Sequence, residues 1–304
     1  MTSRPYAIYD VFTSEALAGN PLAVVFDSEG LDTSRMQAIA REFNLSETVF
    51  LFPPEGKMHN AALRIFMPTG ELPFAGHPTV GAAVALAQQD GRLDHGPALL
   101  VLEEKVGAVR TAVKRDGTGT FAEFDLPRLP ERQPCPVTKA DAAAALGLDP
   151  QEIGFENHMV SAWSAGVPYV CIPVRNLGVA QRARLNDTVW LAALGNPEPL
   201  DAPNPYVYCR DTVNHDSHFH VRMFAGPHGI PEDPATGSAA AAFIGAIVHF
   251  DEPSIGRHRM ILEQGIEMGR PSFIHLEIEV EHATLLAGRI GGYAVKVAEG
   301  TLFA

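Results

Sequence analysis

The alternation of apolar and polar residues predicts a chain built mainly of strands, with a few helices between them. Short apolar runs bounded by Gly, Pro, Asn or Ser recur along the whole chain and are typical of β-strands. In the first half these runs cover residues 6–12, 22–26, 48–52, 62–67, 98–104, 106–114 and 119–127. In the second half they cover residues 160–174 (two strands joined by a turn), 206–210, 218–224, 259–265, 272–280, 284–290 and 293–300.

A second pattern, with apolar residues three and four apart, predicts helices. Residues 33–43 place Met36, Ile39, Ala40 and Phe43 on one helical face. Two alanine-rich runs predict longer helices, from about 77 to 89 and from about 238 to 250, and shorter helices are expected within 141–148 and 187–195. Because helices do not alternate regularly with strands, the pattern disfavours a doubly wound parallel sheet.

The two halves of the chain resemble each other. Arg64–Pro78 and Val221–Ala239 share an Arg-(Ile/Met)-Phe strand, a Gly/Pro loop with an acidic residue, the spacing Pro-x-x-Gly and a helix. A repeat of this length predicts two domains of like fold that face each other across a cleft. The Pro-rich stretch 126–137 is the candidate linker. We therefore expect domains at 1–127 and 128–304, and the tail at about 290–304 is a candidate addition to the first.

The repeated segments each place a glycine before a helix, Gly76 and Gly237. Free backbone amides and the positive end of the helix dipole at such starts favour anions. Two matched starts would form a paired anion cradle beside His77, Asp233 and Ser238. The alternative is local and structural: Ser238 caps its helix and Gly76 makes a tight turn.

A third candidate is Glu47, which stands before the apolar strand TVFLF. Partial desolvation of such a carboxylate suits it to proton transfer. A solvated loop acid is the alternative, and the local sequence does not distinguish Glu47 from its neighbour Glu42.

Other reactive side chains are less organised. His218 and His220 are two residues apart and would lie on one face of a predicted strand, close in sequence to His215. A histidine pair of this kind is a weak indication of a zinc site. The three cysteines are scattered and form no CxxC motif, so neither a disulfide framework nor a zinc knuckle is expected. A Walker loop, a GxGxxG motif and a Ser–His–Asp arrangement are also missing. We expect no metal and no cofactor.

Charge narrows the choice of partners. The formal net charge is −13, which argues against a nucleic-acid-binding protein. No apolar run approaches the roughly 20 residues that span a bilayer, and the first residues lack the order of a signal peptide. We therefore expect a cytoplasmic protein that binds a small molecule.

Five motifs together resemble the PhzF-like (phenazine biosynthesis protein) isomerase/epimerase family. They are GNPLAVVF, NLSETVFL, RIFMPTGELPFAGHPTVGAA, EDPATGSAA and QGIEMGRPS, which begin at Gly19, Asn44, Arg64, Glu232 and Gln264. They follow the family's order and span nearly the whole chain.

The resemblance implies an α+β fold like diaminopimelate epimerase, in which two similar domains each wrap a mostly antiparallel, barrel-like sheet around a central helix. It implies a cofactor-independent isomerase that shuttles a proton between carbons of a small, cyclic amino carboxylic acid in the cleft. Glu47 would be the general base and acid, and homodimers are expected. The implied substrate-binding residues are Ser46, Gly76, His77, Asp233, Gly237 and Ser238. Related epimerases use two cysteines at the helix starts, but Cys135, Cys171 and Cys209 lie outside these motifs.

Two other hypotheses remain open at this point. The chain could be a small-carboxylate binding protein that keeps the cleft without turnover, or a zinc hydrolase built on His215, His218 and His220.

Overall fold

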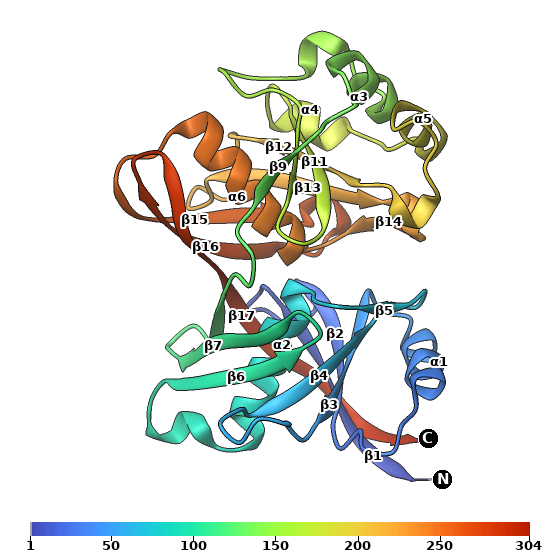
Figure 1. The fold of residues 1–304 in the computed structure, drawn as a ribbon, viewed down its shortest axis with the longest axis vertical. Helices are drawn as coiled ribbons and strands as arrows, with labels where there is room; N and C mark the ends of the chain where they lie inside the picture. The colour runs from blue at the N-terminus through green and yellow to red at the C-terminus, as the bar shows by residue number, and fades with distance from the viewer. Residues whose placement is uncertain (1) are drawn as a thin grey trace. The chain divides into compact units, whose positions relative to one another are not determined.

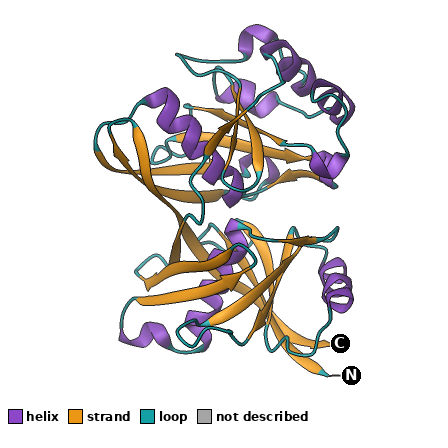
Figure 2. Ribbon diagram, in the orientation of Figure 1, coloured by secondary structure: helices purple, strands orange, loops and turns teal. Residues whose placement is uncertain are grey.

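The computed structural model describes residues 2–304, whose strands pair into a mixed, mostly antiparallel sheet accompanied by helices (Figures 1 and 2). This confirms the α+β class. The chain divides into two compact units, one of residues 1–127 with 289–304 and the other of residues 128–288. Each unit has its own part of the sheet and its own apolar central helix.

The first unit contains most of the short strands predicted from the N-terminal half. Its strands are β1 (Ser3–Val11), β2 (Asn20–Val25), β3 (Glu47–Phe52), β4 (Ala61–Phe66), β5 (Glu71–Leu72), β6 (Ala98–Glu104), β7 (Gly107–Arg115), β8 (Thr120–Asp125) and most of β17 (Thr284–Phe303). Its helices are α1 (Thr33–Phe43) and α2 (Gly76–Gln89).

The sheet of the first unit closes on itself around α2. Neighbouring strands pair in the order β17, β1, β2, β3, β4, β6, β7 and β8, and β8 pairs back onto β17. Helix α2 contacts β1, β2, β3, β6, β7 and β8. It is apolar on all sides, as an enclosed helix must be. A Cβ at Gly81 would lie 2.5 Å from the Leu22 side chain, so glycine allows the helix to approach β2 closely.

The second unit follows the same plan with extra helices. Its strands are β9 (Glu131–Gln133), β10 (Ser161–Ser164), β11 (Pro168–Pro173), β12 (Asn204–Cys209), β13 (Phe219–Ala225), β14 (Ile230–Asp233), β15 (Gly256–Gln264) and β16 (Ser272–Glu281). Its helices are α3 (Lys139–Leu146), α4 (Leu177–Arg182), α5 (Asp187–Ala193) and α6 (Gly237–Asp251).

Strand pairing repeats between the units. In the first unit β2 and β3 are parallel, β3 and β4 antiparallel, and β4 and β6 parallel, with β5 and α2 inserted before β6. In the second unit β11, β12, β13 and β15 pair in the same sequence, with β14 and α6 inserted before β15. The segments whose sequences match therefore occupy matching places in the two sheets.

An arginine braces the hairpin before each central helix. Arg64 on β4 contacts both carboxylate oxygens of Glu71 on β5, at 2.8 and 2.7 Å. Arg222 on β13 contacts both oxygens of Glu232 on β14, at 2.8 Å each. The side chain of Arg64 is 29% exposed and that of Arg222 is 2% exposed. The second pair is therefore much better shielded from water.

The predicted helices are confirmed within a residue at the three longest. The 33–43 helix has the predicted bounds, and the two alanine-rich helices each begin one residue earlier than expected, at Gly76 and Gly237. Ser238 is therefore the second residue of α6, and the N-cap position belongs to Thr236. The structural alternative, in which Ser238 caps the helix, is wrong.

One other prediction needs correction, and two elements were not expected. The tail forms one strand, β17, in place of two, because β8 pairs with it across Gly291 and Gly292 and β1 pairs with it from Ala294 onward. The boundary between the units lies inside the candidate linker, which also contains an unexpected strand, β9, paired with β10. Helix α4 was not expected, and Asn176 begins it by accepting a hydrogen bond from the Val179 amide.

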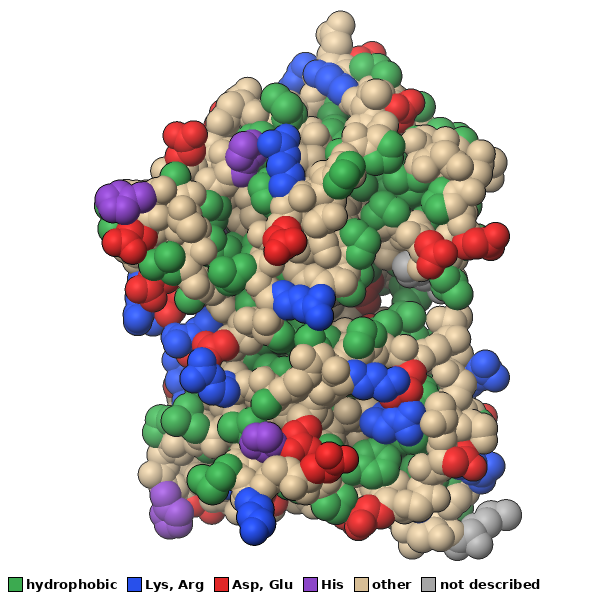
Figure 3. Space-filling view, in the orientation of Figure 1, with side chains coloured by type: hydrophobic (Ala, Val, Ile, Leu, Met, Phe, Trp, Pro, Cys, Tyr) green, Lys and Arg blue, Asp and Glu red, His purple; other side chains and the backbone are tan. Residues whose placement is uncertain are grey.

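The surface mixes charges of both signs. On the face drawn in Figure 3, basic and acidic side chains are interspersed. Among the described helices, none has the length and apolar character needed to cross a membrane.

The two arginine braces lead to a stability prediction. Glu232→Ala should cost about 3 kcal/mol of unfolding free energy, because among the described residues it leaves the deeply buried Arg222 with only Glu267, 3.7 Å away, as a carboxylate partner. Glu71→Ala, the matched control, should cost about 1 kcal/mol because water reaches Arg64. Urea denaturation of both variants measures the difference, and equal losses would contradict it.

Candidate functional site

Glu47 is placed by the end of α1 and the start of β3. Asn44 ends α1 in the left-handed conformation (φ 52°), and its N–H bonds the Ala40 carbonyl. The chain then turns, and β3 starts at Glu47, which lies beside Leu22 in the parallel pairing with β2. The Glu47 side chain is only 14% exposed. The neighbouring Glu42 is on the exposed side of α1.

His77 meets Glu47 at the start of the central helix. His77 is the second residue of α2 and is 3% exposed. Its Nδ1 lies 3.2 Å from Glu47 Oε2 and 3.5 Å from Asn20 Nδ2. Asn20 is fully buried at the start of β2. The structure therefore brings together His77 and Glu47, which were predicted from separate motifs.

Burial sets the charge of His77. It lowers the pKa of the imidazole to about 3, because a protonated ring would lose its hydration in this enclosed place. At neutral pH the ring is therefore uncharged, and its contact with Glu47 is a hydrogen bond to a neutral imidazole. The other nitrogen, Nε2, is buried and has no hydrogen-bond partner among the described residues. Such an atom is typical of a place that a ligand completes.

The central helices differ from the others at their first turns. Side chains cap α1, α3, α4 and α5, through Asp32, Thr138, Asn176 and Asn186. Neither Ala75 before α2 nor Thr236 before α6 makes a side-chain cap. Gly76 and Gly237, both buried, are the first residues of these helices. Their first-turn amides can therefore interact with an anion.

The second unit holds a compact polar cluster before α6. Asp233 ends β14, is 6% exposed, and accepts a hydrogen bond of 2.6 Å from the Thr236 hydroxyl. Gln264, fully buried at the end of β15, donates to the Asp233 carbonyl at 2.8 Å and accepts from the Thr236 amide at 3.2 Å. The Thr236 hydroxyl thus orients the Asp233 side chain, while Gln264 holds the Asp233 backbone.

Ser238 has a different partner. Its hydroxyl lies 2.7 Å from the Tyr169 hydroxyl on β11, and the residue is half-buried. Ser46, also half-buried, precedes β3 directly.

Several polar residues of these clusters were missed from the sequence. Asn20, Thr236 and Gln264 lie inside quoted motifs, so their positions carried a signal, but Tyr169 lies outside all five motifs. Their contacts join strands that are distant in the chain.

None of the three cysteines belongs to the first turn of either central helix. Cys171 and Cys209 are buried on β11 and β12, and Cys135 is half-buried. Burial raises the pKa of all three thiols, that of Cys209 to about 12. These thiols are therefore protonated at neutral pH.

The histidines weighed as zinc ligands have other partners. His220 is fully buried between Glu263, at 2.8 Å, and Glu267, at 3.1 Å. Hydrogen bonds to these carboxylates outweigh the cost of burial and raise the pKa of His220 to about 9. His218 Nδ1 accepts from the Ile261 amide, and His215 is exposed beside Asp216.

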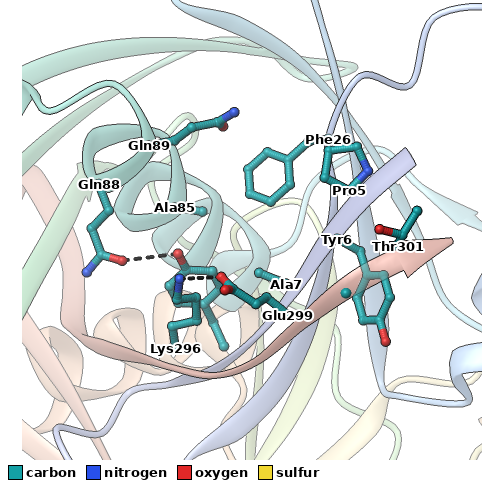
Figure 4. A pocket seen from close by; sticks show the side chains of 12 residues that line it. Pro5, Tyr6, Ala7, Phe26, Ala85, Gln88, Gln89, Lys296, Glu299 and Thr301 are labelled. Carbon is teal, nitrogen blue, oxygen red and sulfur yellow. Dashed lines mark hydrogen bonds and ion pairs between the residues drawn. The ribbon is translucent and has the colours of Figure 1, made fainter. Parts of the chain in front are cut away.

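A cavity of about 450 Å³ lies at the other end of α2 (Figure 4). Tyr6 and Phe26 form apolar walls, while Gln88 accepts from the Tyr9 hydroxyl at 3.1 Å and Lys296 pairs with Glu299 at 2.6 Å. Its polar groups already pair with one another, and none of the predicted site residues lines it. We therefore place the candidate site at the helix start.

Comparison with known proteins identifies the class. The model of the PhzC-PhzF family, phenazine biosynthesis-like protein, matches residues 9–300. An uncharacterized isomerase of Mesorhizobium japonicum is 57% identical over 303 residues, covering all of both chains. The trans-2,3-dihydro-3-hydroxyanthranilate isomerase of Pseudomonas aeruginosa is 33% identical over 307 residues, covering 98% of this chain and 99% of that one. The crystal structure of a PhzF-family protein of Bacillus anthracis superposes with a TM-score of 0.88 at 27% identity, covering both chains fully.

The chain therefore belongs to the PhzC-PhzF, phenazine biosynthesis-like family. It is an isomerase of that family. The family resemblance and the enzyme class expected from the sequence are confirmed.

The neutral state of His77 predicts how stability depends on pH. The folded pKa of about 3 lies below the ordinary value of 6.5, so the unfolded chain binds the proton first as the pH falls. Stability contributed by neutral His77 should be complete above pH 6.5 and be lost toward pH 3, by up to about 1.4 kcal/mol per pH unit. Urea denaturation between pH 7 and 4 should show that His77→Asn has a shallower slope than the wild-type protein. Parallel slopes would contradict the prediction.

Proposed function

We propose that this isomerase moves a proton between two carbons of a small cyclic amino carboxylic acid, without a cofactor, with Glu47 as base and then acid. The contact that carries this proposal is the 3.2 Å approach of His77 Nδ1 to Glu47 Oε2 at the uncapped start of α2. Supporting it, a relative 33% identical over nearly the whole chain is an isomerase of trans-2,3-dihydro-3-hydroxyanthranilate.

The proposed reaction needs no oxidant or reductant. The Glu47 carboxylate takes a proton from a substrate carbon, and the electron pair of the broken C–H bond enters the neighbouring π system. A double bond shifts, and the proton on Glu47 forms a new C–H bond at another carbon. The atoms and charge of the substrate are conserved, as an isomerisation requires.

In this proposal His77 orients the Glu47 carboxylate and the substrate. Because burial keeps its ring neutral, Nδ1–H donates to Glu47 and orients the carboxylate without neutralising it. Nε2 then accepts a hydrogen from an amino or hydroxyl group of the substrate. The first-turn amides, that of Gly76 included, hold the substrate carboxylate.

The remaining predicted residues serve binding. We propose that Ser46, Asp233, Gly237 and Ser238 contact the polar groups of the substrate. The fixed positions of two of these residues support this. Asp233 is held by Thr236 and Gln264, and Ser238 is held by Tyr169. Pre-orientation of polar groups of this kind stabilises developing charge without reorganisation during the reaction.

The role of Glu47 can be tested with trans-2,3-dihydro-3-hydroxyanthranilate in D₂O. The wild-type protein should form isomerised product that carries solvent deuterium at carbon. Glu47→Gln should lower turnover by about 10²- to 10⁴-fold, because the amide cannot accept the proton. Product formation by NMR is the measurement.

Glu42→Gln is the matched control, since Glu42 is the nearby exposed acid, and it should leave turnover unchanged. Full turnover by Glu47→Gln would contradict the assignment of Glu47 as the general base. Binding of the compound without exchange in the wild-type protein would favour a small-carboxylate binding protein instead.

Asp233 provides a test of the second unit. Asp233→Asn should keep the hydrogen bond from Thr236, because the amide oxygen still accepts, but it removes the negative charge. We expect kcat/KM to fall about 10- to 100-fold, in line with the loss of a charged hydrogen bond to the substrate. Asp216→Asn, at an exposed acid, is the control. Unchanged kcat/KM in Asp233→Asn would remove this residue from the site.

A further inference from the structure

A second buried carboxyl group lies against the first turns of α2. Glu104 ends β6 and is 8% exposed. Its Oε1 lies 2.7 Å from the Thr79 hydroxyl oxygen, and its Oε2 is buried without a hydrogen-bond partner among the described residues. A carboxylate is rarely buried with one oxygen unsatisfied, because the charge loses its hydration on that side.

The number of hydrogens that Thr79 can donate also indicates that the Glu104 carboxyl group is protonated. The hydroxyl oxygen of Thr79 also lies 2.8 Å from the Ala75 carbonyl oxygen. A hydroxyl group has one hydrogen to donate, and a carbonyl can only accept. If Thr79 donates to Ala75, the hydrogen in its contact with Glu104 must come from the carboxyl group.

We propose that Glu104 is a neutral carboxylic acid that donates to Thr79 and thereby holds the peptide between Ala75 and Gly76. That peptide carries the Ala75 carbonyl on one side and the Gly76 N–H on the other, because the peptide unit is planar and trans. Fixing the carbonyl therefore fixes the direction of the amide at the start of α2. Glu104 is a positioning residue for the anion site, and this part rests on the proposed function.

The surroundings of Glu104 favour the neutral form. Burial raises its pKa to about 8. The charged and titratable groups of the elements packed against it are engaged elsewhere or exposed: Lys105 and Arg64 pair with Glu71, His59 with Glu103, His77 with Glu47, Arg110 with Asp125, and Lys114 and Arg115 are exposed.

Ionisation of Glu104 should disturb the helix start. A carboxylate at this place would draw the Thr79 hydrogen away from Ala75 and leave the Ala75–Gly76 peptide less restrained. It would also place a negative charge near the amides that hold the substrate carboxylate. Both effects weaken anion binding as the pH rises through the ionisation of Glu104.

NMR of the full chain, labelled with ¹³C at glutamate Cδ and ¹⁵N at glycine, tests the proposal without a substrate. In the wild-type protein the Glu104 Cδ signal should titrate with a midpoint near pH 8, and the Gly76 amide signal should shift with the same midpoint. Glu104→Gln should abolish the shift of Gly76. Thr79→Ser should keep the full shift. Thr79→Val, which lacks the hydroxyl, should leave Glu104 titrating but reduce the Gly76 shift to the part caused by the nearby charge alone.

A Glu104 midpoint at the ordinary carboxyl value, or a Gly76 signal that ignores the ionisation of Glu104, would overturn the proposal. The wild-type titration decides this even if the variants fold poorly. Kinetics separate it from the proposed function. With trans-2,3-dihydro-3-hydroxyanthranilate, kcat/KM should fall up to about tenfold per pH unit above pH 8 in the wild-type protein, and Glu104→Gln should lack this fall. If Glu104 and Gly76 titrate together but the protein shows no turnover, the proposed function is rejected and the proposal for Glu104 stands.

Discussion

The enclosure of an apolar helix by a closed sheet is the constraint on which the first unit depends. Helix α2 is buried along most of its length, and the strands around it pair without an open edge. Its first turn therefore lies inside the protein, where no exposed side chain caps it. The polar groups that meet this turn are those that the strands bring: Asn20, Glu47 and Glu104.

This enclosure also determines the protonation states at the helix start. Burial removes the hydration of a charged group and so favours the neutral form of a histidine. His77 is uncharged for that reason. His220 in the second unit is equally buried, but two carboxylates flank it and keep it protonated. The same residue type thus takes opposite charge states in two units of similar connectivity.

Much of the local structure was predictable because it follows from periodicity. The three longest helices and most strands appear where the apolar pattern placed them. The errors occurred where long-range pairing decides. Gly291 and Gly292 looked like a break between strands, but β1 and β8 make the segment a single strand. Ser238 looked like a cap, but α6 begins one residue before it.

The candidate site shows the same division. The motifs of the sequence by themselves determined the family, the helix starts and the set of candidate residues, because motif spacing is a local property. The local apolar and polar pattern did not distinguish Glu47 from Glu42, and the family resemblance chose Glu47 by its place in the motif NLSETVFL. Only the tertiary structure gave the physical difference, by starting a buried parallel strand at Glu47 and setting His77 beside it, while Glu42 stays on the exposed side of α1. Which carboxylate meets which partner is decided by chain segments far apart in sequence, and no local pattern encodes that distance.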